Sequence, residues 1–340
     1  MNSRDLARIL GVSHTTVTLA LNNNPRISEA MRQRVREAAE RHGYHANALV
    51  SALMSRIRQG KPAPVRGEVL AYLSAERTED GWRKLLNVRE CVKGAERQAG
   101  RLGYRLEHFW MGYQGANARQ VSRVLRARAV RGAMILTAVG DSPGLLLDWE
   151  ARPVVSIGYG FRQQRLHQVA NNHVEGVKLC YQKLRSLGCR RIALSITKID
   201  DEQVRHYWWA GFLMSQQLFG GDLLPVHILS GYDADEDFGE WLRTKRPDAI
   251  IGTFPNQSLK FLHEAGVRVP EEVMYASLDI DAEHVGEIAG IRQDWENTGA
   301  AMVDVLAGQI SANEHGLPTV PKVVLIDGRW VPGKTVRWRR

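Results

Sequence analysis

The feature that most constrains this chain is an alternation of strand-length apolar runs with amphipathic helical segments, beginning near residue 69. The expected strands are residues 69–74, 104–109, 132–136, 153–158, 190–196, 226–229, 248–254, 273–280 and 322–326. Strand and helix repeating in this order predict parallel sheets with helices on both faces. Because one sheet cannot hold this many strands, we expect an α/β core of two doubly wound parallel-sheet lobes.

The first 46 residues follow a different pattern, that of a small all-α unit. Residues 5–22 predict two short helices joined by a turn at Gly11, with Ser13 capping the second helix. Their expected buried side chains are Leu6, Ala7, Leu10, Val17, Ala20 and Leu21. Ser28 is expected to cap a third helix, whose apolar side carries Ala30, Met31, Val35, Ala38 and Ala39.

The exposed side of the second helix carries mostly short polar side chains. They are His14, Thr15, Thr16 and Thr18, with Leu19 beside them. A helix of this kind fits a DNA major groove, although a helical hairpin with a purely structural role is the alternative. Residues 1–60 contain nine arginines and four acidic residues, a net charge of +5 out of +9 for the whole chain. This asymmetry favours a polyanionic partner for the N-terminal unit.

The order of GVSHTTVTLALNNNPRIS, RHGY and NALVSALMS resembles the headpiece and hinge of the lactose-repressor and galactose-repressor (LacI/GalR) family. The resemblance continues to the C-terminus. It implies a helix-turn-helix headpiece at 1–46, a hinge helix and linker at 47–64, and a periplasmic-binding-protein-like core at 65–340. It further implies that His14, Thr15 and Leu19 read bases. Phosphate contacts are implied for Ser13, Thr16, Thr18, Asn22 and, near the backbone, Arg26.

The resemblance also implies a hinge helix in the minor groove, where Asn47, Val50 and Leu53 contact DNA and Leu53 wedges between base steps. Three residues depart from the family pattern. Ala46 stands where proline is usual, Leu19 where many members carry arginine, and Val50 where a small residue is usual. These departures leave the operator sequence open.

In the core, the resemblance implies two lobes with an effector between them. Lobe 1 is expected at about 65–170 and 291–320, and lobe 2 at about 171–290 and 321–340. The implied effector-binding residues are Asp279, Trp295, Trp208, Tyr159 and Phe254. For Trp208, packing in the core is the alternative.

The polar residues that the family uses to hold a small sugar are missing from this chain. Trp208 replaces an effector-binding arginine, and Gly158 replaces an aspartate of the first lobe. We therefore expect either no effector or a small molecule that is not a typical monosaccharide, with a carbohydrate as one candidate.

The resulting hypothesis is a transcriptional regulator, a repressor by resemblance, that binds an inverted-repeat operator as a homodimer. No signal peptide or membrane span is predicted, so we expect a cytoplasmic protein associated with the bacterial nucleoid. Three cysteines without a CxxC pair predict buried thiols and no structural zinc. No catalytic constellation, metal site or cofactor is predicted. A solute-binding protein or an enzyme on the same core is the alternative.

Overall fold

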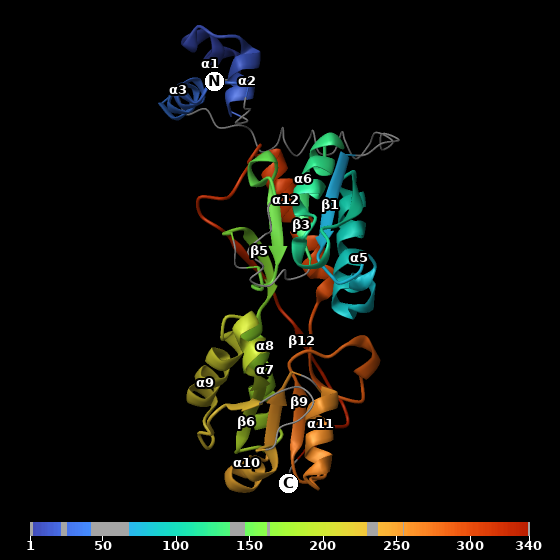
Figure 1. Cartoon of the computed structure of the whole chain (residues 1–340). Helices are drawn as coiled ribbons and strands as arrows, with labels where there is room; N and C mark the ends of the chain where they lie inside the picture. The colour runs from blue at the N-terminus through green and yellow to red at the C-terminus, as the bar shows by residue number, and fades with distance from the viewer. Residues whose placement is uncertain are drawn as a thin grey trace.

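The computed structural model describes residues 3–21, 26–41, 68–136, 147–161, 164–229, 237–253 and 255–338. These residues form a small helical headpiece and a core of two α/β lobes stacked end to end (Figure 1). The C-terminus lies at the far end of the second lobe.

The headpiece contains α1 (Ser3–Leu10), α2 (His14–Leu21) and α3 (Glu29–Arg41). Its own small core consists of Leu6, Ala7, Val17, Ala20, Val35, Ala38 and Ala39, with Leu10, Val12, Ile27 and Met31 packed against it. Apart from Val12 and Ile27, these residues were predicted to lie inside, and that prediction is confirmed. Ala30 is exposed, and the side chain of Leu21 lies outside the description. Gly11 has a φ of +66°, a conformation that glycine adopts without a steric penalty, and it separates α1 from α2.

The first lobe is built on a six-stranded sheet with the order β11-β5-β4-β3-β1-β2, in which every pair is parallel. The strands are β1 (Glu68–Ser74), β2 (Tyr104–Trp110), β3 (Gly132–Ile135), β4 (Val154–Ile157), β5 (His167–Asn171) and β11 (Val323–Ile326). The helical elements of this lobe are η1 (Gly81–Lys84), α5 (Leu86–Arg101), η2 (Tyr113–Gly115), α6 (Ala118–Ala127), η3 (Trp149–Ala151) and α12 (Trp295–Ser311).

One face of this sheet is covered by α5 and α12, and the other by α6. Helices α5 and α12 pack very closely, because glycines lie at their contact. A Cβ atom at Gly94 would overlap the carbonyl of Glu296, and one at Gly299 would overlap the carbonyl of Cys91. This contact lets α12, from late in the chain, form part of the first lobe.

The second lobe has a six-stranded sheet with the order β12-β10-β9-β8-β6-β7, parallel except for the β10–β12 pair. Its strands are β6 (Ile192–Thr197), β7 (His227–Leu229), β8 (Ala249–Gly252), β9 (Met274–Ser277), β10 (Ala289–Arg292) and β12 (Arg329–Val331). Its helices are α7 (His173–Ser186), α8 (Lys198–Gln203), α9 (Tyr207–Phe219), α10 (Phe238–Lys245), α11 (Pro255–Glu264) and η4 (Ala282–His284). Helices α7 and α9 cover one face, and α10 and α11 cover the other.

The chain passes between the two sheets three times: after β5, after β10 and after β11. The position of β11 differs from the expectation, which placed residues 321–340 in the second lobe. Val323–Ile326 pairs in parallel with His167–Asn171 and so completes the first sheet. The strand that it joins was not expected from the sequence, because HQVAN has no apolar run.

Cys91, Cys180 and Cys189 are buried free thiols, as predicted. No helix within the described ranges is long and apolar enough to span a membrane.

Candidate functional site

The predicted DNA-reading helix is α2, whose start is fixed by a side-chain cap. The Ser13 hydroxyl accepts a hydrogen bond from the backbone N–H of Thr16 at 3.0 Å and contacts the Thr16 hydroxyl at 2.8 Å. Val17 and Ala20 are fully buried on the inner side of α2. Among the side chains of α2 that the structure describes, those of Val17 and Ala20 attach the helix to the headpiece core.

The structure describes the side chains of only some of the predicted DNA-binding residues. Ser13 and Arg26 are exposed, and Thr16 and Leu19 are half-buried. The backbone of His14, Thr15 and Thr18 lies in α2, but their side chains fall outside the description. Asn22, Asn47, Val50 and Leu53 also lie outside the described residues.

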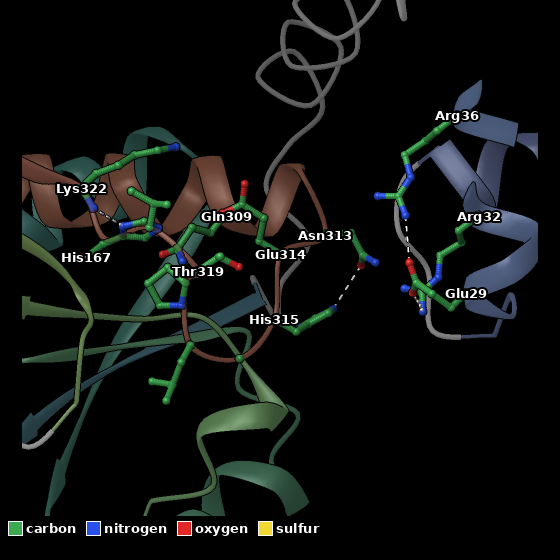
Figure 2. A pocket seen from close by; sticks show the side chains of 14 residues that line it. Glu29, Arg32, Arg36, His167, Gln309, Asn313, Glu314, His315, Thr319 and Lys322 are labelled. Atoms are coloured by element: carbon green, nitrogen blue, oxygen red, sulfur yellow. Dashed lines mark hydrogen bonds and ion pairs between the residues drawn. The ribbon is translucent and has the colours of Figure 1, made fainter. Parts of the chain in front are cut away.

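A hollow of about 640 Å³ lies between α3 and the loop that follows α12 (Figure 2). Each polar contact drawn there joins residues of the same wall. Arg36 pairs with Glu29 inside the headpiece, and the backbone N–H of Lys322 donates to His167 Nδ1 inside the core. These contacts stabilise each wall separately and do not define a ligand site.

A second cavity, of about 320 Å³, lies between the two lobes. The first lobe contributes Lys84, Leu85, Leu86, Asn87 and Trp295, and the second contributes Thr253, Pro255, Asn256, Gln257, Asp279, Asp281, His284 and Arg292. The second-lobe residues follow the carboxyl ends of β8 and β9 or end β10, which is where open parallel sheets bind ligands. The cavity thus has the location expected for an effector site.

Asp279 and Trp295, both predicted effector-binding residues, come together in this cavity from opposite lobes. Burial raises the pKa of Asp279 to about 7, although the guanidinium of Arg292 and a hydrogen bond from Trp295 lower it. The negative charges of Asp281 and Glu90 raise it further. Near neutral pH the Asp279 carboxyl therefore exists in both protonation states, so it can accept or donate a hydrogen bond.

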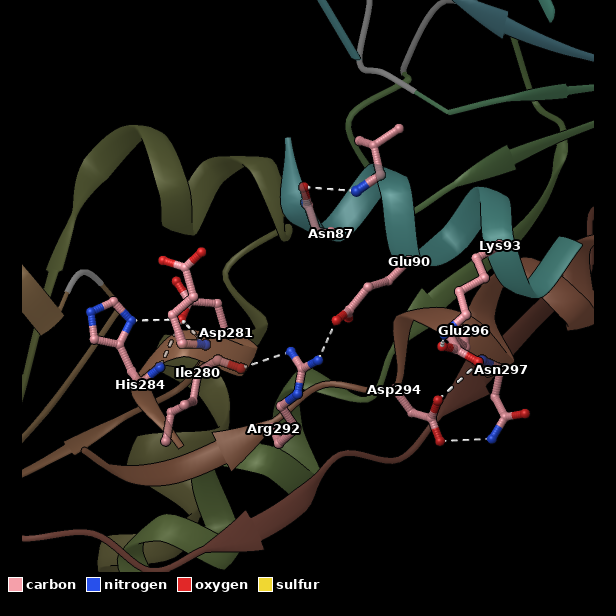
Figure 3. A network of polar contacts seen from close by, with 12 residues as sticks. Asn87, Glu90, Lys93, Ile280, Asp281, His284, Arg292, Asp294, Glu296 and Asn297 are labelled. Carbon is pink, nitrogen blue, oxygen red and sulfur yellow. Dashed lines mark hydrogen bonds and ion pairs between the residues drawn. The ribbon is translucent and has the colours of Figure 1, made fainter. Parts of the chain in front are cut away.

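Arg292, whose charge lowers the pKa of Asp279, joins the two lobes, and Figure 3 shows its guanidinium between Glu90 and Ile280. Its guanidinium donates to the carboxylate of Glu90 on α5 and, at 3.0 Å, to the carbonyl of Ile280. The side chains of Arg292 and Glu90 are 15% and 19% exposed, so this ion pair is largely shielded from water. An interlobe charge pair of this kind restricts movement of one lobe against the other.

Thr253 brings a hydroxyl with no hydrogen-bond partner to the cavity wall. Its Oγ1 is buried and unpartnered, which is costly unless a ligand or water satisfies it. Asn87, Asn256 and Gln257 add amide groups to the same walls. The cavity can therefore bind a ligand with several hydrogen-bonding groups.

Tyr159 and Trp208 do not line this cavity in the described structure. They belong to an aromatic cluster in which Tyr159 is 5% exposed and Trp208 is 9% exposed. Trp208 packs in the core of the second lobe, which was the alternative for this residue. Phe254 lies outside the described residues, while its neighbours Thr253 and Pro255 line the cavity.

Sequence reasoning missed several cavity residues, chiefly Arg292, Asp281 and His284. Arg292 ends a four-residue strand that was not predicted. Asp281 and His284 belong to a turn in which the Asp281 carboxylate accepts from the backbone and the ring of His284. Their position shortly after the strand of Asp279 was the one available signal.

Comparisons with known proteins agree with this architecture. Residues 4–47 match the family model described as bacterial regulatory proteins, lacI family, and residues 181–336 match a periplasmic binding protein-like domain. The repressor PurR of Aliivibrio fischeri (strain MJ11) is 23% identical over 333 residues, which cover 92% of each chain. The regulator CelR of Thermobifida fusca is 25% identical over 321 residues, 90% of this chain and 91% of CelR.

Solved structures show the same fold. A complex of the regulator CelR with cellobiose has a TM-score of 0.60 at 20% identity and covers 99% of this chain and 100% of CelR. A lac repressor dimer bound to operator and the anti-inducer ONPF has a TM-score of 0.59 at 18% identity, with 99% of each chain covered.

A helix-turn-helix headpiece joined to a two-lobed, periplasmic-binding-protein-like core defines a class of DNA-binding transcriptional regulators. By these matches the chain carries a DNA-binding domain of the lacI type at residues 4–47 and a periplasmic-binding-protein-like domain at residues 181–336.

Proposed function

We propose that this protein represses transcription by binding a near-palindromic operator as a homodimer, and that a small-molecule effector in the interlobe cavity controls it. The observation on which this proposal rests is the way α2 is held on the headpiece core. Val17 and Ala20 are buried and Ser13 caps the helix, so this side of α2 is turned inward, and we infer that the opposite side is turned outward. On this proposal, Ser13, His14, Thr15, Thr16, Thr18 and Leu19 face DNA, with Asn22, Arg26, Asn47, Val50 and Leu53 beside them.

Two recognition helices related by a two-fold axis require two half-sites, which is why we propose an inverted repeat. The excess of arginine in residues 1–60 supports attraction to the phosphate backbone. We place this activity on the bacterial chromosome in the cytoplasm and propose binding rather than catalysis as its basis.

For the effector we propose contacts with Asp279 and Trp295. A carboxylate accepts hydrogen bonds from hydroxyl or amino groups, and an indole ring covers an apolar ring face. A volume of about 320 Å³ suits a small ligand rich in hydrogen-bonding groups. Charged and amide side chains around it favour a polar ligand over an apolar one.

The experiment is selection of bound duplexes from a random library by the full-length protein at several salt concentrations. We expect an enriched inverted repeat and a steep loss of affinity as salt rises. Thr15→Ala should alter the selected sequence, whereas Gln33→Ala, on the exposed side of α3, should leave it unchanged. Binding without sequence preference, in the presence or absence of a metabolite panel, would overturn the proposal and favour a solute-binding protein or an enzyme on this core.

A further inference from the structure

The first lobe contributes a buried tyrosine, Tyr159, whose ring contacts side chains of the second lobe. Tyr159 follows β4, and the intervening Gly158 has a φ of +58°, which turns the chain out of the sheet. Tyr159 is only 5% exposed. The ring contacts of Tyr159 therefore depend on the position of the second lobe.

The groups packed against Tyr159 come from α7, α9 and the turn before α9. The ring of Tyr207 meets it edge-on, with centroids 5.1 Å apart and an interplanar angle of 74°. The guanidinium of Arg205 lies 5.2 Å from the centre of the Tyr159 ring. His173 lies 6.1 Å away and in turn contacts Trp208 edge-on at 5.2 Å. These geometries are favourable for aromatic and cation–π contacts.

The turn that presents Arg205 and Tyr207 has an unusual backbone. Arg205 and His206 are consecutive non-glycine residues with positive φ, +57° and +61°. Residues other than glycine rarely adopt this backbone conformation. It persists where surrounding contacts enforce it, often at ligand clamps and switch regions.

Asp201 supplies those enforcing contacts. It is 2% exposed, and its carboxylate contacts His206 Nδ1 at 2.7 Å and accepts from the backbone N–H of Trp209 at 3.3 Å. Its carbonyl accepts from the backbone N–H of His206 at 2.7 Å. The strained turn is thus held by a buried anchor and directed at Tyr159.

We propose that Tyr159 and the Arg205–Tyr207 turn form an interlobe latch, which holds the two lobes together when no effector is bound. A ligand that closes a two-lobed cleft does so by touching both lobes at once. Here the protein's own side chains make such a bridge, and the Glu90–Arg292 ion pair makes another across the same cleft. The closed arrangement is consequently built into the chain, and effector binding does not have to create it.

The latch is tested by measuring the distance between the lobes directly. Native cysteines are buried, so Gln120→Cys on exposed α6 and Lys260→Cys on exposed α11 allow spin labels to be attached to one site in each lobe. Pulsed dipolar spectroscopy is then performed on full-length labelled protein, diluted with an excess of unlabelled protein, without any effector. The test variants are Tyr159→Ala and Tyr207→Ala, and Tyr207 is partly exposed, so its loss disturbs the fold less.

We expect one narrow distance distribution in the parent protein and in Tyr159→Phe, which keeps the ring contact. Tyr159→Ala and Tyr207→Ala should broaden the distribution and shift it by several ångströms. Tyr113→Ala, which removes an exposed tyrosine of the first lobe, is the matched control and should change nothing. The latch is overturned if Tyr207→Ala keeps the narrow distribution, or if the parent protein is already broad.

The inference rests on the proposed function only for its meaning in regulation. Operator binding is measured on the same samples, so the two can fail separately. If the parent protein binds operator but Tyr207→Ala leaves the distance between the lobes unchanged, the latch is rejected. If Tyr207→Ala changes that distance but the parent protein binds no operator, the proposed regulator is rejected.

Discussion

Glu90 on α5 and Arg292 on β10 are separated by 202 residues in sequence and form an ion pair across the interlobe cleft. Because both side chains are mostly shielded from water, removing one charge leaves the other poorly solvated. This pair therefore links the stability of the core to the relative position of its lobes.

Glu90→Gln should lower the free energy of unfolding by about 1–3 kcal/mol, because the half-buried guanidinium of Arg292 loses its counter-charge. Urea denaturation followed by circular dichroism measures the change. Glu271→Gln, which removes the exposed partner of Arg337, is the control and should cost less than about 0.5 kcal/mol. Equal effects of the two variants would show that the interlobe pair is no stronger than a surface pair.

Asp279→Asn should change how stability depends on pH. The folded-state pKa of Asp279, about 7, lies above its ordinary value of 3.8, so the folded protein holds a proton that the unfolded chain has released between these two values. The stability that the folded protein gains from holding this proton is complete below pH 3.8. It falls between pH 3.8 and pH 7, by roughly 1.4 kcal/mol per pH unit at most, and is lost once the pH has risen through 7.

Denaturation at pH 5 and pH 8 checks this expectation. The parent protein should gain stability relative to Asp279→Asn when the pH is lowered from 8 to 5. Asp304→Asn, at an exposed position on α12, should follow the parent protein at both pH values. A pH-independent difference between the parent protein and Asp279→Asn would contradict the raised pKa.

Gly299→Ala should destabilise the first lobe, because the added Cβ overlaps the backbone carbonyl of Cys91 where α12 meets α5. We expect a cost of at least about 1–3 kcal/mol, the range typical of overpacking. Gly308→Ala on the same helix meets nothing within 4 Å and should be neutral or stabilising by about 0.5–1 kcal/mol. Thermal denaturation of the two variants gives the comparison, and similar melting temperatures would exclude close helix packing.

Leu53→Ala should weaken binding to the selected operator more than binding to random duplex. If Leu53 wedges between base steps, it contributes only where the duplex is kinked into the specific complex. Fluorescence anisotropy with both duplexes at one salt concentration measures the two losses, and Leu49→Ala serves as a same-type substitution in the hinge segment. Equal losses on both duplexes would argue against a wedge.

Simple monosaccharides should not bind at micromolar strength. On the family resemblance, Trp208 and Gly158 stand where an arginine and an aspartate would hold a small sugar, and Trp208 packs in the core. Isothermal titration calorimetry with glucose, galactose and ribose should detect no binding with a micromolar dissociation constant. A micromolar dissociation constant for any of them would mean that the remaining cavity groups suffice for a sugar.

Much of the fold could be predicted because its strong local patterns survive in the structure. The apolar run 69–74 became a buried central strand, and the amphipathic segment 84–102 became α5. The missed strands were β5, β10 and β12, which are three to five residues long. In β5, His167, Gln168 and Asn171 are polar residues that are buried against neighbouring segments of the same chain. No apolar run therefore marks this strand. The lobe to which β11 belongs depends on pairing over more than 150 residues, which local pattern does not contain.

Asp279 and Trp295 were predicted from the family resemblance, and both lie next to elements that the sequence also predicts, a strand and the start of a helix. The position of Tyr159 and Trp208 depends on the strained turn at Arg205 and His206, and neither residue type suggests a positive φ. Arg292 was missed because its role arises from Glu90, on the opposite lobe.

The three passages of the chain between the sheets also set an order of events during synthesis. The first lobe lacks both its covering helix α12 and its edge strand β11 until residues 295–326 have left the ribosome. A nascent chain that ends after β5 exposes the apolar surface of an incomplete sheet, so the two lobes mature nearly together, late in translation.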